Sequence, residues 1–277
     1  MTEQETPKET KAKKSATKKP TRKEETQGAV ERAETEGTVS KGSLIYLDYV
    51  GRTKEDGQVF DLTLEDVAKA EGIYKEDSRY EPILVAVGWN WLLGAIEDEL
   101  VGMKVGESKR IEVPPEKGAG PKDPKKVKMI PKMKLAKHGV KGYVGEKVKF
   151  GQEEGVITLS VGRTCRVDFN SPLAGQTLVF DVTVRGIVSD VQEKLKAIVK
   201  RRIPILPDDK YSVTLDGDTI TVELPKESRY IDGVQYAEIG IAKDCLQVHE
   251  KAKQVKVVVT FDRPEENKTS HPTEETS

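Results

Sequence analysis

The 277-residue chain has few of the residues that usually carry covalent or metal chemistry. Its two cysteines, Cys165 and Cys245, lie far apart and form no C-x-x-C pair, which argues against a disulfide framework and a zinc or redox site of that type. Its three histidines are dispersed, and none stands at a spacing that ligates a metal. No P-loop, G-x-G-x-x-G or G-x-S-x-G motif occurs. The sequence therefore predicts no metal and no cofactor, and it gives little support to acid–base, nucleophilic or metal catalysis.

Long apolar runs are also absent from the sequence. No stretch has the length of a membrane span, and the N-terminus has no apolar signal-peptide segment. We therefore expect a reduced, cytoplasmic protein with no membrane partner. Lys plus Arg total 46 and Asp plus Glu total 47, which gives a net charge of −1. Because this balance gives little long-range attraction to polyanions, a nucleic-acid partner is disfavoured.

The composition changes sharply at both ends of the chain. Residues 1–40 are mainly Lys, Glu, Thr and Ala, and such a stretch buries too little apolar surface to offset its ordering entropy. We predict a disordered charged tail there and a second polar tail over 264–277. A basic block in the first tail could contact RNA or a ribosome, but a solvated tail is the simpler interpretation.

Between the tails, alternating strands and short helices predict an α+β fold. Thr63, followed three residues later by a carboxylate, resembles a capping box for a helix over 64–71. Asn90 is expected to cap a second helix that ends at Gly102, with the Ile-Glu-Asp-Glu run at 96–99 on its solvated face.

From Asp190 onward the pattern predicts a self-contained C-terminal α+β domain. An amphipathic helix ended by Pro204 is followed by a hairpin about Asp216-Gly217, a second helix and a final strand.

Three segments together resemble an FKBP-type peptidyl-prolyl cis–trans isomerase. They are YLDYVGRTKEDGQVFD, PILVAVGWNWLLGAIEDELVGMKVGESKRIEVPPEKGAG and LAGQTLVFDVTVRGI, and the run L-x-G-M-x-V-G-E followed by V-P-P-E-x-x-x-G is the most specific part. Between Gly120 and Leu173, the chain carries a long insertion similar to the insert-in-flap chaperone domain of the SlyD branch. The trailing domain resembles that of the long archaeal type.

The resemblance implies a division of the chain into three folded parts. Residues 41–121 and 171–189 would form an FKBP-like antiparallel sheet with a short helix. Residues 122–170 would form a small β-rich insert-in-flap chaperone domain, and residues 190–263 the C-terminal α+β domain.

The resemblance also implies how a chain without an acid–base apparatus acts as an enzyme. An X–Pro bond crosses a barrier of roughly 18–20 kcal/mol because its partial double bond must twist. A dry apolar cleft that accepts the twisted amide better than the planar one lowers this barrier without proton transfer. The family's pocket-lining positions fall in this sequence on Tyr49, Phe60, Asp61, Ile83, Leu92, Leu93, Ile96 and Phe180.

By analogy with the family, three of these residues receive specific roles. The backbone N–H of Leu93 would hold the carbonyl that follows the proline, and Ile96 would form the floor of the pocket. Asp61 would act on the twisting amide through its field and a hydrogen bond. Taken alone, an Asp at the end of a strand is more often a turn or cap residue.

The sequence departs from the family pattern at two pocket positions. Ala119 stands where the family usually has a tyrosine that donates a hydrogen bond to the substrate, and Ile96 replaces a tryptophan. Losing one hydrogen bond typically removes about 0.5–1.5 kcal/mol. We therefore expect reduced isomerase activity and weakened binding of FK506-like macrolides.

The insertion contains a Met-rich segment flanked by lysines. Met129, Ile130, Met133 and Leu135 are candidates for binding unfolded or nascent polypeptides that contain X–Pro bonds, because flexible Met side chains adapt to unlike partners. The alternative is that these four residues form the small core of the insertion itself.

Three functions stay open at this point. The first is a folding catalyst, in which the insertion captures an unfolded chain and the cleft isomerises its prolines. The second is a holdase chaperone with a weakened or inactive cleft, for which Ala119 is the main argument. The third is a nucleic-acid- or ribosome-associated protein acting through its basic tail and insertion. A homodimer through the C-terminal domain is a further hypothesis from the long-type resemblance.

Overall fold

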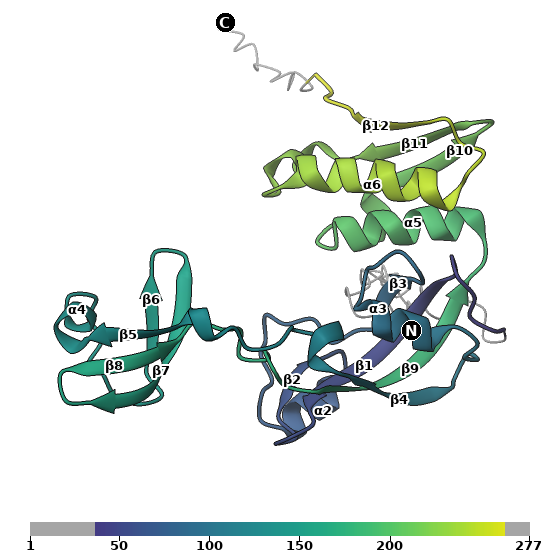
Figure 1. Cartoon of the computed structure of the whole chain (residues 1–277). Coiled ribbons are helices and arrows are strands. Elements are labelled where there is room, and N and C mark those ends of the chain that lie inside the picture. The colour runs from purple at the N-terminus through teal and green to yellow at the C-terminus, as the bar shows by residue number, and fades with distance from the viewer. Residues whose placement is uncertain (1–36, 264–277) are drawn as a thin grey trace, which may run out of the picture.

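The computed structural model describes residues 37–263, whose strands form three separate sheets (Figure 1). The first sheet has the strand order β2–β1–β9–β4, and β3 pairs with β1 as well. All its pairings are antiparallel. Its strands are β1 (Leu44–Thr53), β2 (Val59–Leu62), β3 (Ile83–Ala86), β4 (Ser108–Val113) and β9 (Leu178–Val188). Together with the short helices, these sheets confirm the predicted α+β fold class.

The central strand β1 contributes side chains to two different cores. Successive side chains of a strand point to opposite faces of the sheet. Ile45 and Leu47 belong to the core beneath α3 (Gly94–Leu100), whereas Leu44 and Tyr46 belong to a core shared with the C-terminal helices. One strand therefore connects the face that carries α3 to the C-terminal part of the chain.

The insertion forms the second sheet, which stands apart from the rest of the molecule (Figure 1). Its antiparallel strands follow the order β5–β8–β7–β6. Leu135, Ile157 and Val167 are fully buried in a core of its own. The small β-module expected here is confirmed, but its first strand and its helix were not predicted. The elements are β5 (Val127–Pro131), α4 (Lys132–Ala136), β6 (Lys147–Phe150), β7 (Glu153–Val161) and β8 (Thr164–Asp168).

The C-terminal part pairs two helices with the third sheet, of order β10–β11–β12. The Asp190 carboxylate caps the first helix by accepting the N–H of Glu193 at 3.0 Å. This helix lies between the five-stranded sheet and the second helix (Figure 1), and its buried side chains join Leu44 and Leu84 in one core. The C-terminal part is thus not packed independently, as the sequence suggested, but shares its core with the first sheet. The elements are α5 (Val191–Arg202), β10 (Ser212–Asp216), β11 (Thr219–Leu224), α6 (Val234–Val248) and β12 (Gln254–Val259).

The helix expected over 64–71 is confirmed within one residue at each end by α2 (Glu65–Ala70), but both helix caps expected in the first part of the chain are wrong. The helix α2 has no side-chain cap, and the Thr63 hydroxyl instead donates to buried Asp48 at 2.7 Å. The helix α3 begins only at Gly94, and Asn90 lies before it with a positive φ of 58°. Four short 3-10 helices complete the described chain: η1 (Pro115–Lys117), η2 (Pro124–Lys126), η3 (Asp208–Lys210) and η4 (Lys226–Tyr230).

The expected boundary of the N-terminal tail at residue 40 is also wrong. Val39 is 1% exposed and packs in the core beneath α3. Its N–H donates to the Met103 carbonyl and its own carbonyl accepts from Gly102, both at 2.8 Å. Residues 1–36 of that predicted tail, and the predicted tail over 264–277, lie outside the described residues.

Candidate active site

A small, mostly apolar cavity of about 160 Å³ opens on the α3 face of the five-stranded sheet. Its floor is made by Ile96 of α3 and Phe180 of β9, both buried. The other lining residues come from β1, β2, β9 and the segment before α3: Leu47, Tyr49, Phe60, Asp61, Leu92, Leu93 and Val182. The cavity depends on tertiary structure, because it joins residues separated by more than a hundred positions in sequence.

A glycine allows the aromatic wall of this cavity to form. Phe60 and Phe180 meet edge to face, with ring centroids 5.6 Å apart. Gly51 lies opposite both Asp61 and Phe180 in the sheet. A Cβ atom at Gly51 would come within 2.8 Å of the Phe60 ring and 3.0 Å of the Phe180 ring. Any larger residue there would displace one ring, and the sequence analysis missed this requirement.

Asp61 and Tyr49 are joined at the rim of the cavity. The Tyr49 hydroxyl donates to Oδ2 of Asp61 at 2.7 Å, while Oδ1 accepts the N–H of Leu62 at 3.0 Å. Burial raises the pKa of the Tyr49 hydroxyl well above its ordinary value, and the hydrogen bond to the Asp61 carboxylate raises it further. Tyr49 therefore stays a neutral donor, and the Asp61 carboxylate is held at the cavity with its side chain exposed.

A buried polar group fixes the two strands that carry this pair. The Asp48 carboxylate is 4% exposed and accepts from the Thr63 hydroxyl at 2.7 Å and from Nε of Arg185 at 2.5 Å. The Thr63 hydroxyl oxygen in turn accepts the backbone N–H of Tyr49 at 3.0 Å. Because a buried carboxylate needs such partners, this network holds the middle of β1 against the end of β2 beside the cavity.

A second buried carboxylate shapes the segment before α3. Glu97 is 3% exposed, so the predicted solvated face of the 96–99 run is wrong at this position. Its carboxylate accepts three backbone N–H groups, from Gly88 at 2.8 Å, Asn90 at 3.0 Å and Leu92 at 2.8 Å. These bonds stabilise the loop in which Asn90 takes its positive φ. The loop presents Leu92 and Leu93 to the cavity.

Comparison with known proteins identifies the family. A model described as FKBP-type peptidyl-prolyl cis-trans isomerase matches residues 35–185, which is more than half of the chain. The chain belongs to this isomerase family. A second model, described as FKBP26_C-terminal, matches residues 191–262. The resemblance seen in the sequence, including the long form with a C-terminal domain, is therefore confirmed.

Curated relatives agree with this assignment. The short-type peptidyl-prolyl cis-trans isomerase of Methanocaldococcus jannaschii is 35% identical over 159 residues, which are 54% of this chain and 94% of that protein. The FKBP-type 16 kDa isomerase of Escherichia coli strain K12 is 32% identical over 133 residues, 46% of this chain and 87% of that protein. The isomerase SlyD of Aeromonas hydrophila is 29% identical over 157 residues, 55% of this chain and 66% of that protein. The family model and these relatives therefore support the isomerase activity that the sequence predicted.

Two of the residues expected in the isomerase pocket lie elsewhere. Ile83 lines a different and larger cavity on the far side of Leu92. Ala119 is exposed and is not part of the cavity lining. The remaining seven are brought together around one cavity: Tyr49, Phe60, Asp61, Leu92, Leu93, Ile96 and Phe180.

The four candidate residues of the insertion separate into two classes. Met129 and Met133 are 60% and 76% exposed. Ile130 and Leu135 are buried in the core of the insertion, as the alternative interpretation expected for all four. Only the two methionines are therefore available to a partner.

Residues 37–263 contain neither a cluster of metal-ligating side chains nor a helix suited to span a membrane. Within residues 37–263, no group of three or more His, Cys, Asp or Glu side chains is arranged to hold a metal ion. In the same part of the chain, no helix combines the length and apolar character needed to cross a membrane.

We predict that Tyr49 ionises only at a pH above that of an ordinary tyrosine. The absorbance of tyrosinate is titrated against pH in the wild type and in Tyr49→Phe, and the difference between the two curves reports the ionisation of Tyr49. Since the pKa of Tyr49 is raised, this difference should titrate above the ordinary tyrosine pKa of about 10. Stability linked to this group is fully present below about pH 10 and is lost as the pH rises toward the folded-state pKa. A difference titration centred near pH 10 would contradict the geometry described above.

Proposed function

We propose that the cavity isomerises X–Pro bonds by fitting the twisted amide better than the planar one. At the top of the rotational barrier the amide loses conjugation and becomes less polar, so an apolar, water-poor cavity favours it. The ring of the proline would lie on Ile96 and between the aromatic side chains of Tyr49, Phe60 and Phe180. A volume of about 160 Å³ is sufficient for one proline ring.

The proposal gives the substrate carbonyls two polar partners. Among residues 37–263, no acceptor takes the backbone N–H of Leu93, which lies at the N-cap position of α3. This donor is therefore available to the carbonyl that follows the proline. The Asp61 carboxylate, held by Tyr49, acts electrostatically on the carbonyl carbon of the twisting amide.

Ala119 and Ile96 set the expected level of activity. The exposed methyl group of Ala119 has no hydroxyl to donate to the substrate, and Ile96 offers a smaller floor than an indole. We therefore expect slow but measurable catalysis and weakened binding of FK506-like macrolides. A holdase with an inactive cleft is the second candidate, and the exposed Ala119 is the observation in its favour.

We propose that the insertion is a chaperone domain that captures unfolded polypeptides. Its described surface carries several exposed apolar side chains, namely Met129, Met133, Tyr143, Val144 and Val161. An apolar surface of this kind is expected at a binding site for apolar segments. Capture near the cleft raises the effective concentration of X–Pro bonds at the catalytic site.

The proposed division of labour follows the expected domains. Residues 41–121 and 171–189 catalyse, residues 122–170 capture, and residues 190–263 brace the isomerase sheet through the shared core. We propose a cytoplasmic location for this chaperone. A homodimer through the C-terminal part is supported by exposed Tyr236 and Ile239 on α6.

The catalytic proposal predicts that Asp61→Ala lowers kcat/KM for a short neutral X–Pro peptide by roughly tenfold. The reason is that an interaction of the twisted amide with a charged group contributes on the order of 1.5–3 kcal/mol. A protease-free isomerisation assay measures it, and Asp66→Ala, an exposed carboxylate on α2, is the matched control.

The same assay separates the two candidate functions. Peptide turnover that falls with Asp61→Ala and not with Asp66→Ala supports the catalytic cleft. Turnover equal to the uncatalysed rate in the wild type, with aggregation of an unfolded client still suppressed, would instead support the holdase.

The capture proposal predicts that Met129→Ser combined with Met133→Ser weakens the suppression of client aggregation. The change removes two of the exposed apolar side chains of the insertion and leaves the core residues Ile130 and Leu135 in place. Turnover of short peptides should stay within about twofold of the wild type, because the insertion core and the cleft do not overlap. Ser substitutions at exposed Lys147 and Arg163 are the control. Unchanged suppression in the methionine variant would refute this role of the two side chains.

A further inference from the structure

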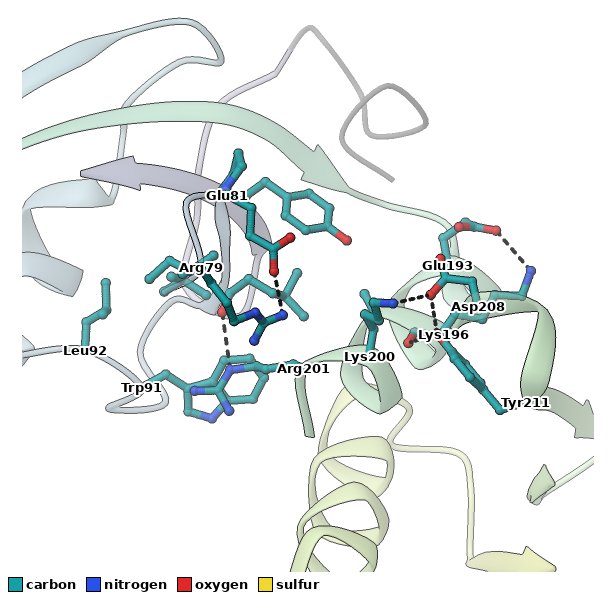
Figure 2. A pocket seen from close by; sticks show the side chains of 16 residues that line it. Arg79, Glu81, Trp91, Leu92, Glu193, Lys196, Lys200, Arg201, Asp208 and Tyr211 are labelled. Atoms are coloured by element: carbon teal, nitrogen blue, oxygen red, sulfur yellow. Dashed lines mark hydrogen bonds and ion pairs between the residues drawn. The ribbon is translucent and has the colours of Figure 1, made fainter. Parts of the chain in front are cut away.

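A second cavity of about 500 Å³ lies between the isomerase sheet and α5 (Figure 2). Its size falls within the range of roughly 300–1,000 Å³ that is typical of ligand pockets. One side is formed by Tyr46, Arg79, residues 81–85, Trp91 and Leu92, and the other by side chains of α5 and by Asp208 and Tyr211. Neither the isomerase sheet nor the C-terminal part forms this cavity alone.

The two cavities adjoin at one residue. Leu92 lines both the isomerase cleft and the larger cavity. An extended chain advances about 3.3–3.6 Å per residue. A polypeptide with its proline over Ile96 can therefore pass Leu92 and place a nearby side chain in the second cavity.

The cavity contains an arginine that lacks a carboxylate partner. Figure 2 shows the Arg201 guanidinium flat against the Trp91 ring, and its carbon Cζ lies 3.8 Å from the ring centroid. Its Nε donates to the Leu84 carbonyl at 3.3 Å. Within the described residues, these are its attractive contacts, and no carboxylate lies at ion-pair distance. The neighbouring Arg202, by contrast, is paired with Asp244 at 2.6 Å.

The other charges of the cavity are already compensated by neighbours. Each lining carboxylate has a cation within ion-pair distance, so the lining keeps one uncompensated positive charge. The pairs are Arg79–Glu81 at 2.5 Å, Lys196–Glu193 at 3.3 Å and Lys200–Asp208 at 3.1 Å.

The environment of Arg201 favours an anion in the cavity. Burial lowers the pKa of its guanidinium and the nearby charge of Arg202 lowers it further, while the Asp244 carboxylate, which is paired with Arg202, opposes this in part. A guanidinium has five N–H donors arranged to bind a carboxylate with two parallel hydrogen bonds. Trp91 holds the group in place, so little conformational freedom is lost when a carboxylate binds.

We propose that this cavity is a subsite of the isomerase in which Arg201 binds an acidic side chain of the polypeptide substrate. The Asp or Glu would lie a few residues from the isomerised proline, and the subsite would give the enzyme a preference for acidic sequences. This inference rests on the proposed isomerase function, because binding of the proline in the cleft positions the neighbouring residues of the substrate.

The test uses the full-length protein and peptides with blocked, uncharged termini. In each peptide one Gln, at one to four residues on either side of the proline, is compared with Glu. At low salt we expect kcat/KM to be roughly five- to tenfold higher for Glu at one of these positions. Arg201→Gln should remove this preference and leave turnover of the Gln peptides unchanged, and Arg201→Lys should restore part of it. Lys256→Gln, which removes an exposed charge on β12, is the control and should keep the preference.

Three results would overturn the inference. They are equal turnover of all Gln and Glu pairs by the wild type, a Glu preference that survives in Arg201→Gln, and a preference that is equally lost in Lys256→Gln. If Arg201→Gln does not fold, the salt dependence of the wild type decides. At about 0.5 M salt the Glu preference must shrink, because a charge–charge contribution at a half-buried site is screened.

A binding measurement separates this inference from the isomerase proposal. The only two tryptophans of the chain, Trp89 and Trp91, lie beside each other, and Trp91 lines the second cavity. Their fluorescence should respond at lower concentration to the Glu peptide than to its Gln counterpart, and Arg201→Gln should equalise the two. If no peptide is isomerised, the isomerase proposal fails while this titration still decides whether the subsite exists. Equal affinities in the wild type would refute the subsite.

Discussion

The buried Glu97 carboxylate is the interaction on which both cavities depend. It accepts three backbone N–H groups of the segment before α3, and these donors would otherwise lie unsatisfied near the core. The resulting loop turns Leu92 and Leu93 toward the isomerase cleft and leaves Trp91 against Arg201 of α5. One side chain thus sets the position of residues that belong to the proposed catalytic cavity and to the proposed subsite.

The strand β1 explains why the C-terminal part is coupled to the cleft. Its alternate side chains enter the core beneath α3 and the core shared with α5, so a shift of the strand would disturb both. The insertion is different, because its buried residues form a core of their own and it joins the sheet by two connecting segments (Figure 1). Mutations can therefore alter the proposed capture by the insertion without changing the cleft, whereas a mutation in the core shared with the C-terminal part is expected to affect the cleft as well.

Local patterns predicted most of the strands, the C-terminal helices and the hairpin about Asp216-Gly217 because alternation and turn residues encode them directly. The family motifs pointed to Tyr49 and Asp61, which the structure joins by a hydrogen bond. Long-range partners could not be predicted from composition or spacing. The Thr63 hydroxyl donates to Asp48 instead of capping a helix. The Glu97 carboxylate is buried because it accepts three backbone N–H groups. The cavity beside Arg201 depends on how α5 packs against the sheet, which no local pattern specifies.

The most direct test of this account is Glu97→Gln, with Asp98→Asn at the next, exposed position as the control. The neutral amide lacks the negative charge that the three backbone N–H groups share, and its NH₂ group cannot accept a hydrogen bond from them. The change therefore removes about 1.5–3 kcal/mol of local stabilisation. Amide hydrogen exchange of Gly88, Asn90 and Leu92 should accelerate at least tenfold, and kcat/KM for a neutral X–Pro peptide should fall by a similar factor. Unchanged exchange at these three amides together with unchanged turnover would contradict the central role of the Glu97 carboxylate.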